Sequence, residues 1–277
     1  MTSVAVHLDS ASTTAPVLDG LLPLCTEALP AAERLLEAAR ASVLAIVAPA
    51  GGKIDADLLE ANQTAAHGYA WMATYVEGLR QILGWAGRLD ASGELGELES
   101  LILQAAFGEY LAQLVGGVPL SQVEIVRPGD LGVPAEALAA YQTEAVAKLI
   151  AQGAAAPVRL RIAELVADHN NFGKLALEDE TLDMVRDQFN RFAQDMVVPN
   201  AHGWHERDEL IPLEVVEQMA ELGVFGLTVP EEFGGLGMGK TSMCVVSEVL
   251  SQAYIGVGSL GTRSEIAAEL IRLGGTQ

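Results

Sequence analysis

The sequence predicts an all-α protein, in which an N-terminal helical bundle is followed by a second helical domain. Half of its 277 residues are hydrophobic, so core material is plentiful and a disordered chain is excluded. Aromatic residues make up only 5%, and alanine and leucine, which favour helices, are abundant throughout. Apolar residues recur every three or four positions between Gly and Pro breaks, which is the helical period.

The predicted bundle covers residues 16–157 and follows a tail, residues 1–15, that we expect to be disordered. Each helix is bounded by Gly, Pro or a capping residue, and short connections favour antiparallel neighbours. A segment with a Pro-Gly-Asp turn, residues 118–134, is expected to be an extended loop. The four bundle helices are predicted at about residues 31–48, 55–89, 95–115 and 135–150.

A linker, residues 158–174, is predicted to contain a short helix at about 159–168 and then a loop. The second domain covers residues 175–277. Its first helix is expected to begin at a Thr181 cap and to end at Val198, before Pro199. Further helices are predicted at about residues 212–223, 242–252 and 262–273.

The charge balance excludes several classes of partner. There are 16 Lys and Arg against 37 Asp and Glu, a formal net charge of −21. Such a chain repels nucleic acid and anionic membrane surfaces, so we expect neither as a partner. Cys25 and Cys244 lie too far apart for a metal motif and are expected to be buried thiols in a reducing compartment. Without a secretory signal or a spanning segment, a cytoplasmic location is predicted.

One glycine-rich segment matches the P-loop pattern. Residues 234–241 read GGLGMGKT, where a true P-loop would cradle phosphates with backbone N–H groups and a lysine. Glu231 and Glu232 stand just before it and would repel a triphosphate. Neither flank offers the strands of a parallel sheet, so a glycine-rich loop between helices is favoured over an ATP site.

A second glycine-rich segment, GVGSLG at residues 256–261, matches the dinucleotide fingerprint. That fingerprint requires a buried strand before it, whereas the preceding SMCVVSEVLSQA is typical of a helix. We therefore disfavour NAD binding. The glycines are expected to let the backbone pass close to a helix or to a ligand.

Several spaced motifs fit a different class of protein. ELGVFG at residues 221–226 precedes VPEEFGGLG at 229–237, a helix pattern ends at Pro199, and IRLGGTQ closes the chain. Together they resemble the N-terminal helical domain of acyl-CoA dehydrogenases over about a hundred residues, from 175 to 277. The resemblance implies an all-α fold for this domain, a flavoprotein oxidoreductase as the complete enzyme, and FAD as its cofactor.

The resemblance also implies how the complete enzyme works. A glutamate removes the α-proton of an acyl-CoA while hydride passes from the β-carbon to FAD, and electron-transfer flavoprotein accepts the electrons. Homo-oligomers, dimers or tetramers, are typical of the family. Gln277 falls within a motif, so we expect the catalytic glutamate and most FAD contacts to lie beyond it. None of the glutamates in this sequence is assigned as the base, no cofactor-binding residue is assigned, and the chain alone is expected to be inactive.

Two segments narrow the expected substrate. The N-terminal extension with HGYAW at residues 67–71, and the segment 254–266, resemble family members that act on methylsuccinyl-CoA in the ethylmalonyl-CoA pathway. This substrate is a short branched dicarboxylic thioester. The alternatives are an acyl-CoA dehydrogenase of different acyl specificity and a non-catalytic helical module that supports assembly.

The candidate substrate-binding residues are Arg263, Thr262 and Ser259. In the family, the stretch that corresponds to residues 258–265 lines the inner end of the acyl pocket. A guanidinium there can bind the free carboxylate of a dicarboxylic acyl group in a bidentate manner. Alternatively, Arg263 pairs with Glu265 or Glu269. Thr262 and Ser259 are weaker candidates for hydrogen bonds to substrate, with helix capping as the alternative.

Two further groups of residues are given structural roles. His67, Trp71 and Tyr75 share one face of a helix, which is typical of core packing or of a domain interface. His202 and His205, with acidic neighbours, match no zinc spacing. We therefore predict a polar loop between helices there and no metal site.

Overall fold

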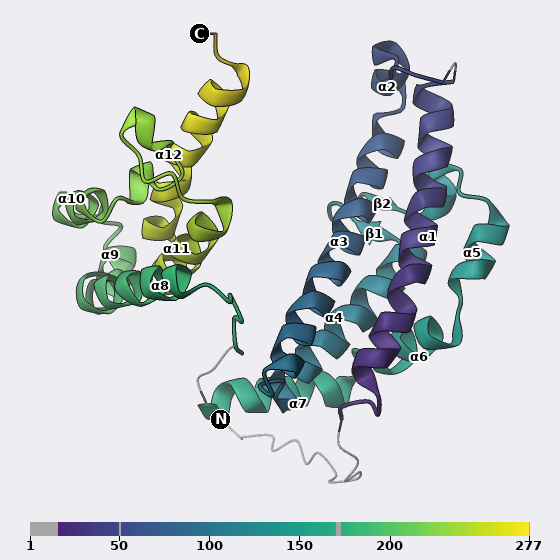
Figure 1. Ribbon diagram of the computed structural model, residues 1–277, viewed down its shortest axis with the longest axis horizontal. Coiled ribbons are helices and arrows are strands. Elements are labelled where there is room, and N and C mark those ends of the chain that lie inside the picture. The colour runs from purple at the N-terminus through teal and green to yellow at the C-terminus, as the bar shows by residue number, and fades with distance from the viewer. Residues whose placement is uncertain (1–15, 50, 170–172, 277) are drawn as a thin grey trace. The chain divides into compact units, whose positions relative to one another are not determined.

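The computed structural model describes residues 16–49, 51–169 and 173–276 (Figure 1), so the predicted tail lies outside the described residues. The chain divides into two compact units, Met1–Ala176 and Leu177–Gln277. Both are helical, which confirms the predicted all-α fold. None of the described helices combines the length and the apolar character needed to cross a bilayer.

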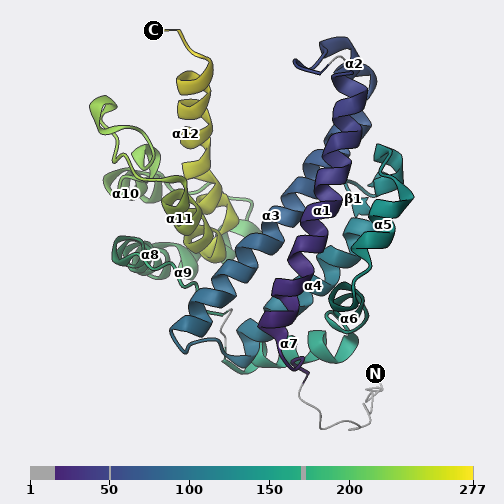
Figure 2. The same cartoon turned by 45° about the vertical axis from the view of Figure 1, so that its right-hand side comes forward.

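The first unit is built on three long helices that lie side by side in both views (Figures 1 and 2): α1 (Leu21–Val47), α3 (Gln63–Ala91) and α4 (Glu97–Gly116). Shorter helices cover α1 and α4. They are α2 (Ala56–Ala61), α5 (Ala135–Tyr141), α6 (Glu144–Gln152) and α7 (Ala156–His169).

The core of this unit follows the helical spacing of its apolar residues. Fully buried side chains repeat at three- and four-residue intervals along each long helix: Leu35, Ala39, Met72, Val76, Leu79, Leu103, Phe107 and Leu111. Each large one contributes roughly 1.5–3 kcal/mol by leaving water. The buried Tyr141 hydroxyl donates to the carbonyl of Leu111 over 2.7 Å, so α5 is joined to α4 by a satisfied polar contact as well.

Several predicted boundaries in this unit are wrong. Helix α1 starts ten residues before the predicted residue 31 and passes through Pro30, whose ring is exposed while Ala28, Ala31 and Ala32 pack in the core. That packing outweighs the one backbone bond that proline removes. The predicted helix 55–89 is interrupted at Asn62, although Asp55 caps its start as expected.

Two further boundaries differ for local reasons. The predicted loop at 118–134 contains an antiparallel pair of two-residue strands, β1 (Val118–Pro119) and β2 (Ile125–Val126), and a 3₁₀ turn, η1 (Pro128–Leu131). The predicted helix 135–150 divides before Glu144. The Thr143 side chain accepts a hydrogen bond from the N–H of Val146 and so caps a new helix, α6.

Helix α7 contains the short helix that was predicted within the linker. It packs on α4 through a small apolar cluster of its own: Leu98, Leu101, Val158 and Leu165. By its contacts, α7 belongs to the first unit.

The described residues of the second unit form five α-helices joined by shorter turns: α8 (Glu180–Phe192), a π-helical segment η2 (Ala193–Val197), α9 (Val198–Glu206), α10 (Leu213–Glu221), η3 (Val224–Gly226), η4 (Glu231–Phe233), α11 (Lys240–Ala253) and α12 (Ile255–Gly274). Helix α11 lies against α8 and α12. The core consists mainly of Phe189, Val197, Met219, Val224, Val246, Leu250 and Val257.

Three predictions for this unit need correction. Asp179, not Thr181, caps α8, because its carboxylate accepts from the N–H groups of Thr181 and Leu182. The helical path does not end before Pro199. It continues through the π-helical turn into α9, where Pro199 occupies the first turn and needs no N–H bond. The last helix begins at Ile255 rather than at 262.

Candidate functional site

The glycine-rich segment 256–261 forms the first turns of α12. A Cβ at Gly258 would lie 2.6 Å from the backbone nitrogen of Ser251 in α11, and one at Gly261 would lie 2.7 Å from a methyl of Val224. Of the two expectations for these glycines, a close approach to a helix is therefore the one that the structure shows. The missing side chains let α12 lie directly on α11 and η3.

One face of α12 carries a network of charged and polar groups, which we call the Lys240 network: Thr228, Lys240, Glu265, Glu269 and Arg272. Glu265 accepts hydrogen bonds from the Thr228 hydroxyl and from the Lys240 ammonium. Glu269 forms ion pairs with Lys240 at 2.8 Å and with Arg272 at 2.7 Å.

The network changes the acid–base properties of its members. The hydrogen bond from Arg272, and then that from Lys240, lower the pKa of Glu269 to about 2. Glu265, and then Glu269, raise the pKa of Lys240. The lysine of the P-loop pattern is therefore held by two carboxylates of the chain itself.

The opposite face of α12, which we call the Arg263 face, contains Ser259, Arg263, Ile266 and Leu270. Arg263 is exposed, and its side chain forms no hydrogen bond or ion pair with any described residue. Ile266 and Leu270, three and seven positions further along, are 56% and 68% exposed. The result is a positive group beside an uncovered apolar strip, an arrangement that suits a short acyl chain ending in a carboxylate.

The alternative in which Arg263 pairs with a neighbouring glutamate does not occur, because Glu265 and Glu269 bind Lys240 instead. Helix geometry explains this: positions two or six residues apart do not share a face.

The hydroxyls of Ser259 and Thr262 are used within α12. Ser259 donates to the carbonyl of Gly256 over 3.0 Å and Thr262 to that of Ser259 over 2.8 Å. Both side chains are half-buried. Neither caps the helix, and each keeps lone pairs that can still accept a hydrogen bond.

The P-loop-like segment is folded onto itself. The N–H groups of residues 234–238 all donate to carbonyls within residues 226–231. In a phosphate site, consecutive N–H groups of such a loop point at the ligand instead. This geometry agrees with the predicted glycine-rich loop between helices.

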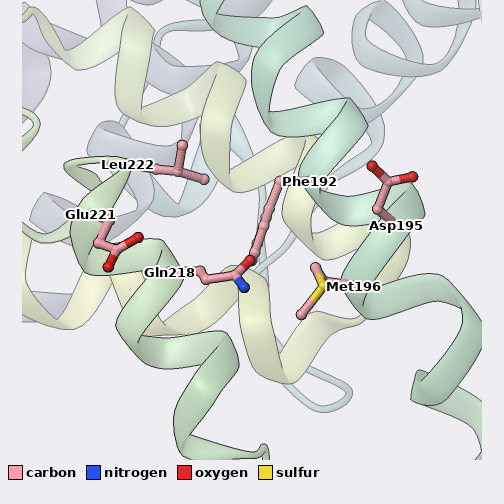
Figure 3. A pocket seen from close by; sticks show the side chains of 6 residues that line it. All are labelled: Phe192, Asp195, Met196, Gln218, Glu221 and Leu222. Carbon is pink, nitrogen blue, oxygen red and sulfur yellow. The ribbon is translucent and has the colours of Figure 1, made fainter.

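A shallow pocket of about 540 Å³ lies in the second unit, between the end of α8 with η2 and the end of α10 (Figure 3). Phe192, Met196 and Leu222 form its apolar part, while Asp195 and Glu221 supply two carboxylates. Such a lining suits a group with an apolar body and a positive charge. It disfavours an anionic acyl group.

The face of α3 that carries His67, Trp71 and Tyr75 lies partly on the surface. Tyr75 and Trp71 are half-buried against the core, whereas His67 is exposed. The indole N–H of Trp71 donates to Nε2 of His67 over 3.0 Å, and Tyr75 donates to Gln113 over 2.6 Å. The predicted packing role therefore fits Trp71 and Tyr75 but not His67.

Two predictions about single residues are wrong. His202 and His205 lie within α9 and not in a loop, because the π-helical turn carries the helix past Pro199. His202 is 3.2 Å from Glu206, one helical turn away. No group of three or more metal-ligating side chains occurs in the described part of the chain.

Cys25 is buried as expected, but Cys244 is exposed on α11.

The contacts of Thr228 and Lys240 with Glu265 were not predicted from the sequence. Their only sequence signal was their position around a glycine-rich loop, where Lys240 was considered as a phosphate ligand. The spacing of Glu265, Glu269 and Arg272 at i, i+4 and i+7 indicates a shared charged face, and it could have pointed to a binding partner for that face.

Residues 179–277 match the family described as "Acyl-CoA dehydrogenase, N-terminal domain". The matched residues make up almost the whole of the second unit.

A relative that matches along most of the chain is (2S)-methylsuccinyl-CoA dehydrogenase of Cereibacter sphaeroides. It is 55% identical over 264 residues, which are 94% of this chain and 47% of the relative. Isovaleryl-CoA dehydrogenase of Solanum tuberosum is 33% identical over 107 residues, 37% of this chain and 26% of that protein. Glutaryl-CoA dehydrogenase of Desulfococcus multivorans is 32% identical over 92 residues, 32% and 22% respectively. The chain thus spans about half the length of the first relative and about a quarter of the others.

Proposed function

We propose that this chain is the N-terminal part of a flavin-dependent acyl-CoA dehydrogenase that acts on methylsuccinyl-CoA. The observation that carries the proposal is the 55% identity to a methylsuccinyl-CoA dehydrogenase, which extends over 94% of the chain and thus includes the helical first unit. The reaction removes a proton from the α-carbon and a hydride from the β-carbon, so a C=C bond forms next to the thioester. The catalytic base belongs to the part of the enzyme outside this chain.

The family implies a flavin, and we propose FAD, with electron-transfer flavoprotein as the electron acceptor. Neither glycine-rich segment of the described residues offers a site for FAD. The loop at 234–238 uses its N–H groups internally, and Gly258 and Gly261 pack against protein. We therefore propose that most FAD contacts come from other parts of the complete enzyme. A cytoplasmic homo-oligomer belongs to the same proposal.

The contribution of the second unit is one wall of the acyl pocket, formed by the Arg263 face. The apolar Ile266 and Leu270 fit the short carbon chain, and the guanidinium of Arg263 fits the free carboxylate. The pocket beside Asp195 and Glu221 cannot serve this purpose, because two carboxylates there would repel the anionic end of the substrate.

The test is the substitution Arg263→Gln in the full-length enzyme, assayed on two thioesters. One is methylsuccinyl-CoA, and the other is 2-methylbutanoyl-CoA, which has a methyl group in place of the free carboxylate. Loss of a charged, bidentate contact costs about 2–3 kcal/mol, so kcat/KM for methylsuccinyl-CoA should fall about 100-fold. The value for 2-methylbutanoyl-CoA should change less than about threefold, because that substrate never made the contact.

Arg207→Gln is the matched control, since Arg207 is an exposed arginine of the same unit whose side chain pairs with Glu209, away from α12. It should leave the ratio of the two kcat/KM values unchanged. An equal loss on both substrates after Arg263→Gln would mean that Arg263 is structural, and no loss on either would reject its role in binding. An enzyme of different acyl specificity would instead prefer the thioester without a carboxylate before any substitution is made.

A further inference from the structure

Three separate elements of the second unit meet at the side chain of Glu265. Thr228 follows η3, Lys240 is the first residue of α11, and Glu265 lies on α12. The Glu265 side chain is only 13% exposed, whereas that of Lys240 is 58% exposed. The protein thus covers most of this carboxylate, and one neutral and one positive donor are directed at it.

The apolar core contacts of α12 come from its first turns, where Val257 is fully buried and Gly258 and Gly261 present bare backbone to Ser251 and Val224. These contacts set how the start of α12 lies on α11 and η3. The C-terminal half of the helix makes few contacts, and Ile271 and Leu273 are each 73% exposed. The Lys240 network is the polar attachment that holds one face of α12 to the rest of the unit.

Rotation of α12 decides where Arg263 points. Successive helical residues are about 100° apart, so Arg263 and Glu265 lie about 200° apart around the axis. Whatever fixes Glu265 toward α11 therefore fixes Arg263 on the opposite side. In addition, Lys240 offsets the negative charge of both Glu265 and Glu269, which would otherwise repel an anionic ligand near this helix.

We propose that Lys240 and Thr228 are positioning residues for substrate recognition: by holding Glu265, they set the rotation of α12 that presents Arg263 to the free carboxylate of the acyl group. The inference rests on the proposed function and deepens it. It gives the lysine of the P-loop pattern a role other than phosphate binding.

The first test is Lys240→Met in the full-length enzyme. KM for methylsuccinyl-CoA should rise about tenfold with a smaller change in kcat, because the reacting carbons are not touched. KM for 2-methylbutanoyl-CoA should change less than threefold. Lys240→Arg should restore most of the loss, since a guanidinium can still pair with both glutamates. Arg207→Met is the control: Arg207 is an exposed cation of the same unit that pairs with Glu209, and its loss should leave both KM values unchanged.

A double-mutant cycle separates positioning from a general structural effect. If Lys240 acts through Arg263, Lys240→Met should have no further effect on KM in the Arg263→Gln background. Hydrogen exchange supplies a readout that needs no substrate: the amides of residues 255–266 should exchange faster in Lys240→Met but not in Arg263→Gln.

The outcomes distinguish the two proposals. If Arg263→Gln impairs methylsuccinyl-CoA turnover but Lys240→Met does not, positioning is rejected and the proposed function stands. Independent, multiplying effects of the two substitutions, or an equal KM rise on both thioesters, also reject positioning. If Arg263→Gln changes nothing, the proposed binding role fails, and the positioning role fails with it whatever the exchange rates show.

Discussion

The backbone N–H of Lys174 donates a hydrogen bond to the buried carboxylate of Glu99 over 3.1 Å. Two side chains of α3 donate hydrogen bonds to backbone carbonyls of the segment 174–176. The indole of Trp85 donates to the carbonyl of Lys174 over 2.8 Å, and Arg88 donates to that of Ala176 over 3.2 Å. The end of the first unit is therefore fastened to α3 and α4 by its backbone. This fixes where the chain leaves the bundle.

Replacing Glu99 by Ala should lower the free energy of unfolding of the first unit by about 1–3 kcal/mol. The substitution leaves the N–H of Lys174 without its acceptor in a half-buried place. Urea denaturation at neutral pH measures the change, and limited proteolysis should show faster cleavage near residues 173–180. Glu37→Ala removes an exposed carboxylate paired with Arg40 and should cost less than about 0.5 kcal/mol. Equal effects of the two substitutions would contradict the assigned role.

Gly258→Ala should destabilise the second unit by about 1–3 kcal/mol, because a methyl group there overlaps the backbone of Ser251 and forces α12 away from α11. Gly87→Ala is the matched substitution in an open place, since nothing lies within 4 Å of a Cβ there. It should stabilise α3 by about 0.5–1 kcal/mol, the helix preference of alanine over glycine. Thermal unfolding of both variants measures the difference in sign. A neutral Gly258→Ala would mean that the two helices are not in close contact.

The helices were predictable because their apolar residues repeat at helical spacing and their breaks carry Gly or Pro. The ends were predicted less well where tertiary packing or an unusual turn outweighed a local signal. The first helix was predicted to start only after Pro30, and another was predicted to end before Pro199, yet the chain continues as a helix through each proline. In the first case buried alanines compensate for the lost bond, and in the second a π-helical turn accommodates the ring.

Part of the candidate site could likewise be predicted from the sequence, and part could not. Family resemblance pointed to Arg263, and amino-acid type alone explains why a guanidinium suits a carboxylate. Whether Arg263 pairs with a neighbouring glutamate depended on which face of α12 meets α11. That is decided by Gly258, Gly261 and the partners of Glu265, which are distant in sequence. The flanks of the glycine motifs lack strands, which is why a loop between helices and a close approach to a helix were predicted for them, and the structure shows both.

The two cysteines should differ sharply in reactivity toward a thiol reagent such as DTNB. Cys244 is exposed on α11 and should react within minutes at pH 8. Burial raises the pKa of the Cys25 thiol to about 12, so the reactive thiolate is scarce and sheltered. One thiol should therefore be labelled in the native protein and two in urea. Cys244→Ser should abolish the fast reaction, and a fast reaction that survives in this variant would place Cys25 at the surface.

The charged face of α12 should weaken in acid. Arg272 and Lys240 lower the pKa of Glu269 from 4.5 to about 2, so folding favours the ionised carboxylate. A group with a lowered pKa in the folded state contributes stability that is present above about pH 4.5 and lost as the pH falls toward 2. The protection of the amides near residues 265–272, which compares their exchange rates with those of the unfolded chain at the same pH, should accordingly fall across this window.

An NMR titration of the Glu269 carboxyl carbon measures the shift directly. The midpoint should lie near pH 2 in the native protein. In Arg272→Gln it should move toward the ordinary value, because the strongest of the two stabilising hydrogen bonds is lost. Glu269→Gln should remove this carboxylate's contribution to acid sensitivity. The protection of the backbone amides near α12 against hydrogen exchange should then depend less on pH between 4.5 and 2. A midpoint near 4.5 in the native protein would show that the Lys240 network does not hold Glu269 in solution.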